Sequence, residues 1–319
     1  MRKALLDPFL LTILGAAVTA SIFPAFGVGA DLLRVATTGA IGVLFFLYGA
    51  RLSPSETLAG LRHWRLHATI FASTYVLFPL VGLGVALALG QHVSAAIVAG
   101  VVYLTLVPST VQSSIALTAI ARGNVAGAVV SASISNILGV FLTPALVWLL
   151  MTRTSDVAIT PEAVGGIVAQ ILAPFVAGQL SRRWTAAFVT SHPRLSLVDR
   201  GSIVLIVYQA FSDGMREGMW TQTSPAQLAI LVGACLVVLA FMLATTWWAA
   251  GRLGFSRPDA IAVQFCGSKK SLATGLPMAG VLFAGHPVGL LILPLMVYHQ
   301  AQLVACTILA TRHAQRDGE

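Results

Sequence analysis

Apolar runs of about 20 residues follow one another along the whole chain, with short polar loops between them. A helix of that length crosses the hydrocarbon core of a bilayer. Hydrophobic residues make up 57% of the sequence and charged residues 9%, whereas a soluble domain has about 25% charged residues. Backbone in lipid must satisfy its own hydrogen bonds, and helices of this length do so. The sequence therefore predicts an all-α polytopic membrane protein.

We predict ten membrane-spanning helices, at residues 8–26, 34–51, 66–89, 94–121, 125–150, 162–181, 201–218, 226–250, 259–285 and 288–311. With these spans, the two termini and the loops on their side carry fourteen of the nineteen Lys and Arg residues, and the opposite loops carry three. The other two are Lys269 and Lys270, inside the ninth span. By the positive-inside rule, both termini are cytoplasmic. We therefore expect a multi-pass protein of the plasma membrane or the bacterial inner membrane.

Ten helices divide into two halves of five, residues 1–157 and 158–319, and an odd number gives the halves opposite orientations. The fourth span contains QSSIA (112–116) and the ninth contains KKSLA (269–273). This similarity pairs Gln112, Ser113 and Ser114 with Lys269, Lys270 and Ser271.

Both spans also carry residues that break helices. Pro108 interrupts the fourth span, and Gly267-Ser268 and Pro277 interrupt the ninth. Interruptions at matching positions of two inverted halves indicate a transporter binding site. The alternative is a pair of ordinary proline kinks. We predict discontinuous helices that line a site.

The tenth span holds His299, with Gln300 and Gln302 beside it. Polar side chains at the centre of a membrane helix face the interior of the bundle, where they find partners. His299 therefore either makes an interhelical hydrogen bond or handles protons and substrate.

Several classes of function lack their motifs. The sequence has no G-x-x-x-x-G-K-[ST], no H-E-x-x-H and no Asp-rich metal motif. The three cysteines lie inside apolar segments without metal-ligand spacing. The net charge of +8 comes from arginines in short loops, so it predicts membrane topology rather than nucleic-acid binding. We expect no metal, no cofactor, no nucleic-acid partner and no enzymatic activity.

Three segments carry a resemblance: FFLYGARLS (45–53), AIARGNVAGAVVSASISNILGVFLTPAL (119–146) and GSKKSLATGLPMA (267–279). Together they resemble the bile acid:sodium symporter (SBF) family, and within it the divergent SBF-like branch with a K-S-L motif in the ninth helix. The resemblance implies ten helices in two inverted repeats. It also implies a panel of helices 1, 2, 6 and 7 on a core of helices 3–5 and 8–10. Broken helices 4 and 9 would cross in that core, and amphipathic organic anions would move with sodium.

The sodium ligands implied by this resemblance are mostly missing. The corresponding positions hold, in chain order, Ser114, Ile115, Ala128, Ala132, Phe265 and Lys269. Ser131 lies beside the altered hydroxyl positions, and Gln264 precedes the ninth-helix break. Because a Na⁺ site needs oxygen ligands, we expect no sodium coupling of the family type.

Three hypotheses explain the two lysines. Both can be cytoplasmic charges that flank a ninth span beginning near residue 271. Alternatively, one lysine replaces the lost sodium and holds the crossed helix ends, because the carbonyls at a helix C-terminus attract a cation. In the third hypothesis, a lysine couples transport to protons, since a buried lysine can gain and lose a proton. We expect Lys269 at the crossing and Lys270 nearer the aqueous cavity.

The sequence thus predicts a secondary active transporter of an organic, anionic, amphipathic solute, surrounded by membrane lipid, with H⁺ as a candidate coupling ion. A non-transporting membrane regulator is one alternative. An integral-membrane lipid enzyme is another, although the paired carboxylates or metal ligands of such chemistry are missing. The candidate substrate- and coupling-site residues are Gln112, Ser113, Ser114, Ser131, Gln264, Lys269, Lys270, Ser271 and His299.

Overall fold

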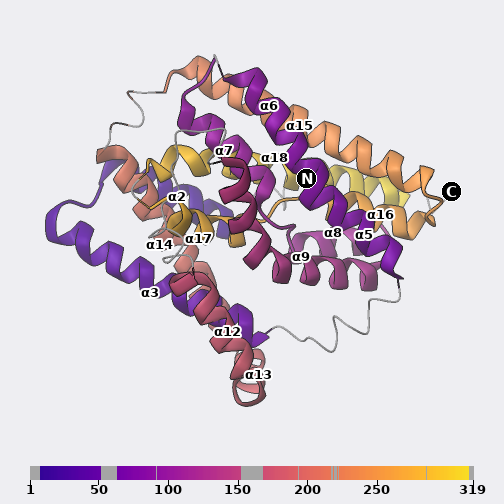
Figure 1. Ribbon diagram of the computed structural model, residues 1–319, viewed down its shortest axis with the longest axis horizontal. Coiled ribbons are helices and arrows are strands. Elements are labelled where there is room, and N and C mark those ends of the chain that lie inside the picture. The colour runs from indigo at the N-terminus through magenta and orange to yellow at the C-terminus, as the bar shows by residue number, and fades with distance from the viewer. Residues whose placement is uncertain are drawn as a thin grey trace.

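The computed structural model describes residues 8–51, 63–90, 92–151, 168–192, 194–216, 218, 221, 223–284 and 286–315, and the regular elements in these ranges are all helices (Figure 1). Five of the described helical segments are long and apolar enough to cross a membrane: α3 (Gly27–Arg51), Trp64–Leu89, Val125–Met151, α15 (Pro225–Arg252) and α18 (Val288–Gln315). Shorter apolar helices accompany them. The chain is therefore a polytopic helical membrane protein.

Two of the long segments contain a widened π-helical turn. Trp64–Leu89 consists of α5 (Trp64–Ala72), the π-helix η2 (Ser73–Leu77) and α6 (Phe78–Leu89). Val125–Met151 consists of α9 (Val125–Leu146) and the π-helix η3 (Val147–Met151). In a π-helical turn an N–H donates to the carbonyl five residues back instead of four, so the carbonyl four residues back loses its usual donor.

Two predicted spans, 94–121 and 259–285, are each divided into two helices. The first gives α7 (Ala95–Leu106) and α8 (Gln112–Ile120), and the second gives α16 (Arg257–Gly267) and α17 (Leu272–Leu282). Val107 is extended, with φ −75° and ψ 156°, because the residue before a proline avoids the helical region. The prediction of interrupted helices at Pro108 and Gly267-Ser268 is confirmed.

The prediction of a loop at residues 182–200 is wrong. Those residues contain α13 (Arg182–Ser191) and the first turn of α14 (Leu195–Arg216). Charged residues such as Arg183 and Arg194 favoured a loop, although α13 also carries apolar side chains at helical spacing. Ahead of α13, η4 (Val168–Leu172) and α12 (Ala173–Leu180) occupy the described part of the sixth predicted span. The predicted boundary between the halves, at residue 157, lies outside the described residues.

The helices pack in two groups (Figure 1). One group contains α2 (Pro8–Ile22), α3, α12 and α14, and the other surrounds the two divided helices. Helix α14 also packs on α17 and α18, so the two groups are in contact. In the first group α3 and α12 approach closely through glycines. A Cβ atom at Gly49 would overlap the carbonyl oxygen of Phe175, and one at Gly178 would overlap that of Phe46. These two positions therefore require glycine.

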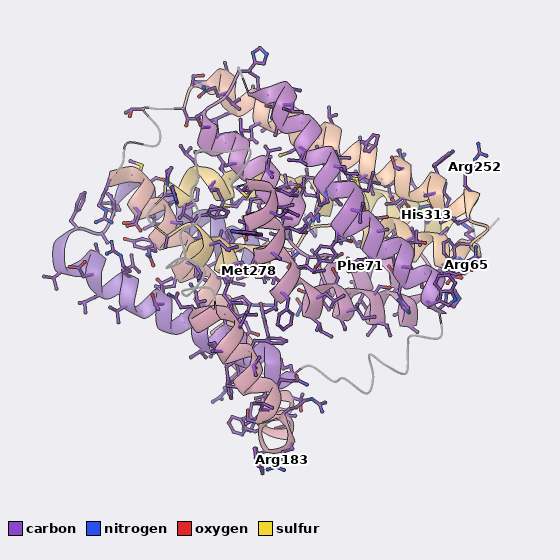
Figure 2. All side chains as sticks on the ribbon, viewed as in Figure 1. Arg65, Phe71, Arg183, Arg252, Met278 and His313 are labelled. Atoms are coloured by element: carbon purple, nitrogen blue, oxygen red, sulfur yellow. The ribbon has the colours of Figure 1, made fainter. Side chains whose placement is uncertain are left out.

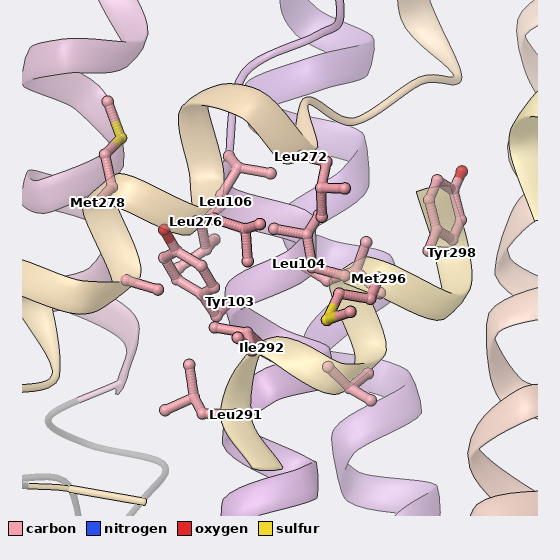
Figure 3. Packing of buried hydrophobic residues seen from close by; sticks show 14 of the residues in the cluster. Tyr103, Leu104, Leu106, Leu272, Leu276, Met278, Leu291, Ile292, Met296 and Tyr298 are labelled. Atoms are coloured by element: carbon pink, nitrogen blue, oxygen red, sulfur yellow. The ribbon is translucent and has the colours of Figure 1, made fainter. Parts of the chain in front are cut away.

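The second group is centred on a buried cluster from α7, α17 and α18 (Figure 3). Tyr103 and Tyr298 are fully buried there. The hydroxyl of Tyr103 donates to Gly275 O at 2.6 Å, and that of Tyr298 donates to Ser268 O at 2.7 Å. Both tyrosines thus bury a large ring and also satisfy carbonyls in or near the divided ninth span.

The A-R-G-N motif joins α8 to α9. Arg122 has a φ of 57° and ends α8. Asn124 caps α9 by accepting a hydrogen bond from Gly127 N at 2.8 Å, and its Nδ2 donates to Asp259 Oδ1 at 2.7 Å. Because Asp259 lies in the first turn of α16, the motif fixes the starts of α9 and α16 to each other.

Candidate functional site at the crossing of two interrupted helices

The two interruptions, Val107–Val111 and Ser268–Ser271, lie against each other. The main-chain N–H of Ser271 donates to Pro108 O at 2.8 Å. In the opposite direction, Ser109 Oγ donates to Cys266 O at 2.7 Å. Main-chain groups that the breaks release are therefore satisfied across the crossing, as apolar surroundings require.

Asn136 on α9 joins the first interruption to the first turn of α17. Its Nδ2 donates to Ser109 O at 2.8 Å, and its Oδ1 accepts from Thr274 Oγ1 at 2.8 Å. One amide side chain thereby bridges the fourth and ninth predicted spans.

Lys270 is the cation at the crossing. Its side chain is fully buried. Nζ donates to the main-chain carbonyls of Thr74, Thr105 and Val107 at 2.9, 2.7 and 2.8 Å. Thr105 and Val107 belong to the C-terminal end of α7, where the helix dipole favours positive charge. The ammonium thus uses all three of its donors.

The carbonyl of Thr74 is free to accept because of the π-helix η2. The N–H of Phe78 donates to Ser73 O, five residues back, instead of to Thr74 O. The next possible donor, residue 79, is a proline and has no N–H. The widened turn and the proline together leave one acceptor for Lys270.

The backbone of Lys270 is held as firmly as its ammonium. Gln302 on α18 accepts from Lys270 N and donates to Lys270 O, both at 2.8 Å. The Phe78 ring lies 4.2 Å from Nζ, within the range of a cation–π contact. Our expectation that Lys270 lies nearer the aqueous cavity is wrong, because it is the lysine bound to the carbonyls at the crossing.

Lys269 differs from its neighbour. It is also fully buried, but its Nζ has no hydrogen-bond partner among the described residues. Its titratable neighbours are the thiols of Cys306 and Cys266. The hypothesis of two cytoplasmic flank charges is contradicted by the burial of both lysines between α16 and α17.

A cavity of about 470 Å³ lies between the two groups of helices and reaches both interruptions, a size typical of sites for small organic ligands. Apolar side chains line the wall on the first group of helices, among them Ile13, Phe175 and Ile203. Hydroxyl and amide groups line the wall at the crossing, among them Thr110 and Asn136.

The N-termini of α8 and α17 both face this cavity. Gln112 and Ser113, the first residues of α8, line it, as do Ser271 and Leu272 at the start of α17. Ser271 caps α17 by accepting from Thr274 N at 3.2 Å. Helix N-termini carry partial positive charge and attract anions.

The charged side chains of the cavity also favour an anion. Arg51 and Asp199 form an ion pair, so their charges cancel. Arg200 lies over the Phe9 ring at 5.5 Å and forms no ion pair with a described carboxylate. The charged side chains that line the cavity within the described ranges therefore sum to a net positive charge.

The whole described chain matches one family of transporters: the family model of the SBF-like CPA transporter family covers residues 7–315. The chain belongs to this family. Its relatives include an uncharacterized protein of Pseudomonas aeruginosa, 49% identical over 97% of this chain and 93% of the relative. "Putative symporter YfeH" of Escherichia coli K12 is 43% identical over 98% and 94%, and mouse "Sodium/bile acid cotransporter 7" is 28% identical over 97% and 93%.

Membership in the SBF-like CPA transporter family confirms the resemblance drawn from the three sequence segments. It makes the chain a transporter rather than an enzyme. The structure adds where the nine candidate residues lie.

Four of the nine candidates line the cavity: Gln112, Ser113, Ser271 and His299. Lys269, Lys270 and Ser114 are buried behind that wall. Ser114 Oγ bonds Thr110 Oγ1 at 2.7 Å and Phe265 O at 3.4 Å.

The other two candidates are absent from the cavity wall. Ser131 Oγ bonds His67 Nδ1 at 2.7 Å. Gln264 bonds Leu243 O at 3.2 Å and His313 Nε2 at 3.0 Å, near the C-terminal end of α18 labelled by His313 in Figure 2.

Ser271 is the N-cap of α17, and Val111 holds the N-cap position of α8. The pairing of Ser271 with Ser114 across the two halves stays a prediction.

Sequence reasoning missed Asn136 and Gln302 as parts of the site. An asparagine inside the apolar helix at 125–150 was the available signal, since such residues seek partners inside a bundle. The only sequence signal for Gln302 is its place beside His299 in an apolar span.

Proposed function

We propose that this protein is a secondary active transporter of an organic, amphipathic anion and that it works without family-type sodium sites. The observation that carries the proposal is the Lys270 ammonium bound to three main-chain carbonyls at the crossing. These oxygens are groups of the kind that coordinate Na⁺. A tethered ammonium there supplies the positive charge that the crossed helix ends attract.

The cavity supports an amphipathic anion as substrate. Its crossing side presents two helix N-termini and hydroxyl groups, and its other side presents apolar and aromatic side chains together with the Arg51–Asp199 pair and Arg200. We place the anionic group of the substrate near Ser113 and Ser271 and the apolar part along Ile13, Phe175 and Ile203. The names of mammalian relatives, which mention bile acid, agree with a substrate of this shape and charge.

We assign proton coupling to Lys269 rather than to Lys270. An ammonium that is buried without a partner is costly compared with the neutral amine. A conformational change that opens Lys269 to water would therefore let it take up a proton, and closure would release it. Lys270, by contrast, has three acceptors that hold its charge.

For the architecture we propose ten membrane helices in two inverted repeats, residues 1–157 and 158–319. Helices α2, α3, α12 and α14 form the panel, and the helices around the crossing form the core. The packing of α2, α3, α12 and α14 on one another supports this division, and α14 contacts α17 and α18 across it. By the distribution of arginine, both termini are cytoplasmic, in the plasma membrane or bacterial inner membrane.

The test is uptake of labelled amphipathic anions into proteoliposomes. Flux should be unchanged when Na⁺ is replaced by K⁺ or choline at fixed pH, and should depend on the pH gradient. Lys269→Met should remove the dependence on the pH gradient, whereas Lys270→Met should lower flux at every pH. A saturable Na⁺ requirement would contradict the proposal. A folded protein without flux of any anion would favour a non-transporting regulator.

A further inference from the structure

Helix α13 forms a separate projection at one end of the molecule. It follows α12 directly and packs on α12 and α3. Figure 1 shows it beyond the end of α12, and Figure 2 shows Arg183 at that tip. The cavity and the crossing make no use of its exposed face.

The two faces of α13 differ in chemistry. Its inner face contributes Val189 to a small buried cluster with Leu47 and Ala50 of α3. Its outer face carries Trp184 and Phe188, one turn apart, with exposed fractions of 66% and 57%. An exposed aromatic stripe on a short helix is typical of helices that lie in the plane of a membrane interface.

The charged residues of α13 and of the segment that leads into α14 are all arginines. Residues 181–198 contain three arginines, Arg182, Arg183 and Arg194, and no Asp or Glu. None of the three forms an ion pair with a described carboxylate. Arg182 Nε is buried and has no hydrogen-bond partner among the described residues. The Arg183 guanidinium lies 3.7 Å from the centre of the Trp184 ring. Positive charge and aromatic surface thus occur on the same turn.

We propose that α13 is a docking surface for anionic phospholipids of the bilayer. Its arginines bind the phosphate headgroups, and Trp184 and Phe188 insert at the level of the headgroups. Charge complementarity supports a lipid occupant, because guanidinium binds phosphate in a forked geometry. The positive-inside rule explains why arginines occur in this part of the chain. It does not explain why exposed aromatic side chains occur beside them on α13.

The position of α13 connects this surface to the cavity. The inner cluster with Leu47 and Ala50 holds α13 against the last turn of α3. Arg51, the residue after Ala50, lines the cavity and pairs with Asp199. A lipid bound at α13 is therefore held next to one edge of the cavity.

The test uses the full chain in nanodiscs and requires no transport. A Thr190→Cys variant carries an environment-sensitive fluorophore on the exposed side of α13, since the three native cysteines are buried. Brominated phosphatidylglycerol or brominated phosphatidylcholine, at equal mole fraction, then quenches the probe. We expect stronger quenching by phosphatidylglycerol, and a preference that weakens as salt is added.

Replacing Arg182 and Arg183 by glutamine should reduce the preference for phosphatidylglycerol about thirtyfold, which corresponds to about 1 kcal/mol for each arginine. Arg252→Gln is the matched control. Arg252 lies 5.3 Å from the Trp248 ring at the end of α15, so it keeps the same kind of Arg–Trp pair away from α13. Its replacement should leave the preference unchanged.

Three results would overturn the proposal. These are equal quenching by both lipids in the Thr190→Cys protein, a preference that survives in the double glutamine variant, and an equal loss of preference in Arg252→Gln. Inorganic phosphate that displaces the lipid, where NaCl of equal ionic strength does not, would also contradict the proposal. The site would then bind soluble anions.

Discussion

Replacing the two adjacent lysines by methionine, one at a time, should have different effects on stability. Lys270→Met removes the donor from three buried carbonyls, those of Thr74, Thr105 and Val107. An unsatisfied buried acceptor costs about 1–3 kcal/mol. The loss of a desolvated charge offsets part of this cost, so we expect the lower end, about 3 kcal/mol in total.

Lys269→Met removes an equally buried amino group that has no hydrogen-bond partner among the described residues. Methionine fills a similar volume and strands no acceptor there. We therefore expect unchanged or increased stability. Because the two variants have the same composition and neighbouring positions, each is the control for the other.

The measurement is the melting temperature of the purified protein in detergent, determined from the loss of monodisperse protein on heating. At roughly 2 °C per kcal/mol, Lys270→Met should melt about 6 °C below the wild type. Lys269→Met should melt at the wild-type temperature or above it. Equal losses in both variants, or no loss in Lys270→Met, would refute the reasoning.

A shorter side chain extends this test. Lys270→Ala leaves the three carbonyl oxygens facing the space of the lost side chain. Na⁺ binding there would stabilise the folded state by mass action. Added NaCl should therefore raise the melting temperature of Lys270→Ala more than choline chloride does, while the wild type should respond equally to both salts. An equal response of Lys270→Ala would show that these oxygens do not form a cation site.

Three further predictions concern the crossing, the helix packing and the cavity. Asn136→Ala removes the bridge between the fourth and ninth predicted spans, so flux should fall at least tenfold with a stability loss of about 2 kcal/mol, measured by uptake and melting of the same preparation. Gly49→Ala should abolish monodisperse expression because of its overlap with a main-chain carbonyl, whereas Gly39→Ala on the same helix, which meets no atom within 4 Å, should behave as wild type. Arg200→Gln should weaken anion binding about tenfold, since a contact between unit charges in partly solvated surroundings is worth about 1–4 kcal/mol, and Arg312→Gln should leave binding unchanged in the same titration.

The sequence was sufficient for the features that depend on composition and on helix-breaking residues. Long apolar runs predicted the membrane class, and Pro108 and Gly267-Ser268 predicted the interruptions. The position of the lysines between apolar segments left two outcomes open, burial or cytoplasmic flank charges, and the structure shows burial. These inferences need only local sequence, because a bilayer and a missing N–H restrict the backbone wherever they occur.

The sequence was insufficient to distinguish Lys269 from Lys270. Their difference depends on groups far away in the chain: the carbonyl that η2 exposes at Thr74, and the Gln302 amide that holds the backbone of Lys270. Ser131 was expected at the site for a similar reason, but His67 on α5 bonds its hydroxyl instead. Which partner a polar group finds in a bundle depends on helix packing, and local sequence patterns do not reveal that packing.

The covalent attachment of the ammonium at the crossing has an energetic consequence for the direction of transport. A cation that belongs to the chain cannot be carried through and released, so under the proposed function no sodium gradient contributes energy through that position. A monovalent anion moving alone then experiences the membrane potential in full, about 2.3 kcal/mol per 100 mV. With the interior negative, this term favours efflux by about fiftyfold at 100 mV. Accumulation inside the cell would require at least one accompanying proton per anion merely to cancel the electrical term.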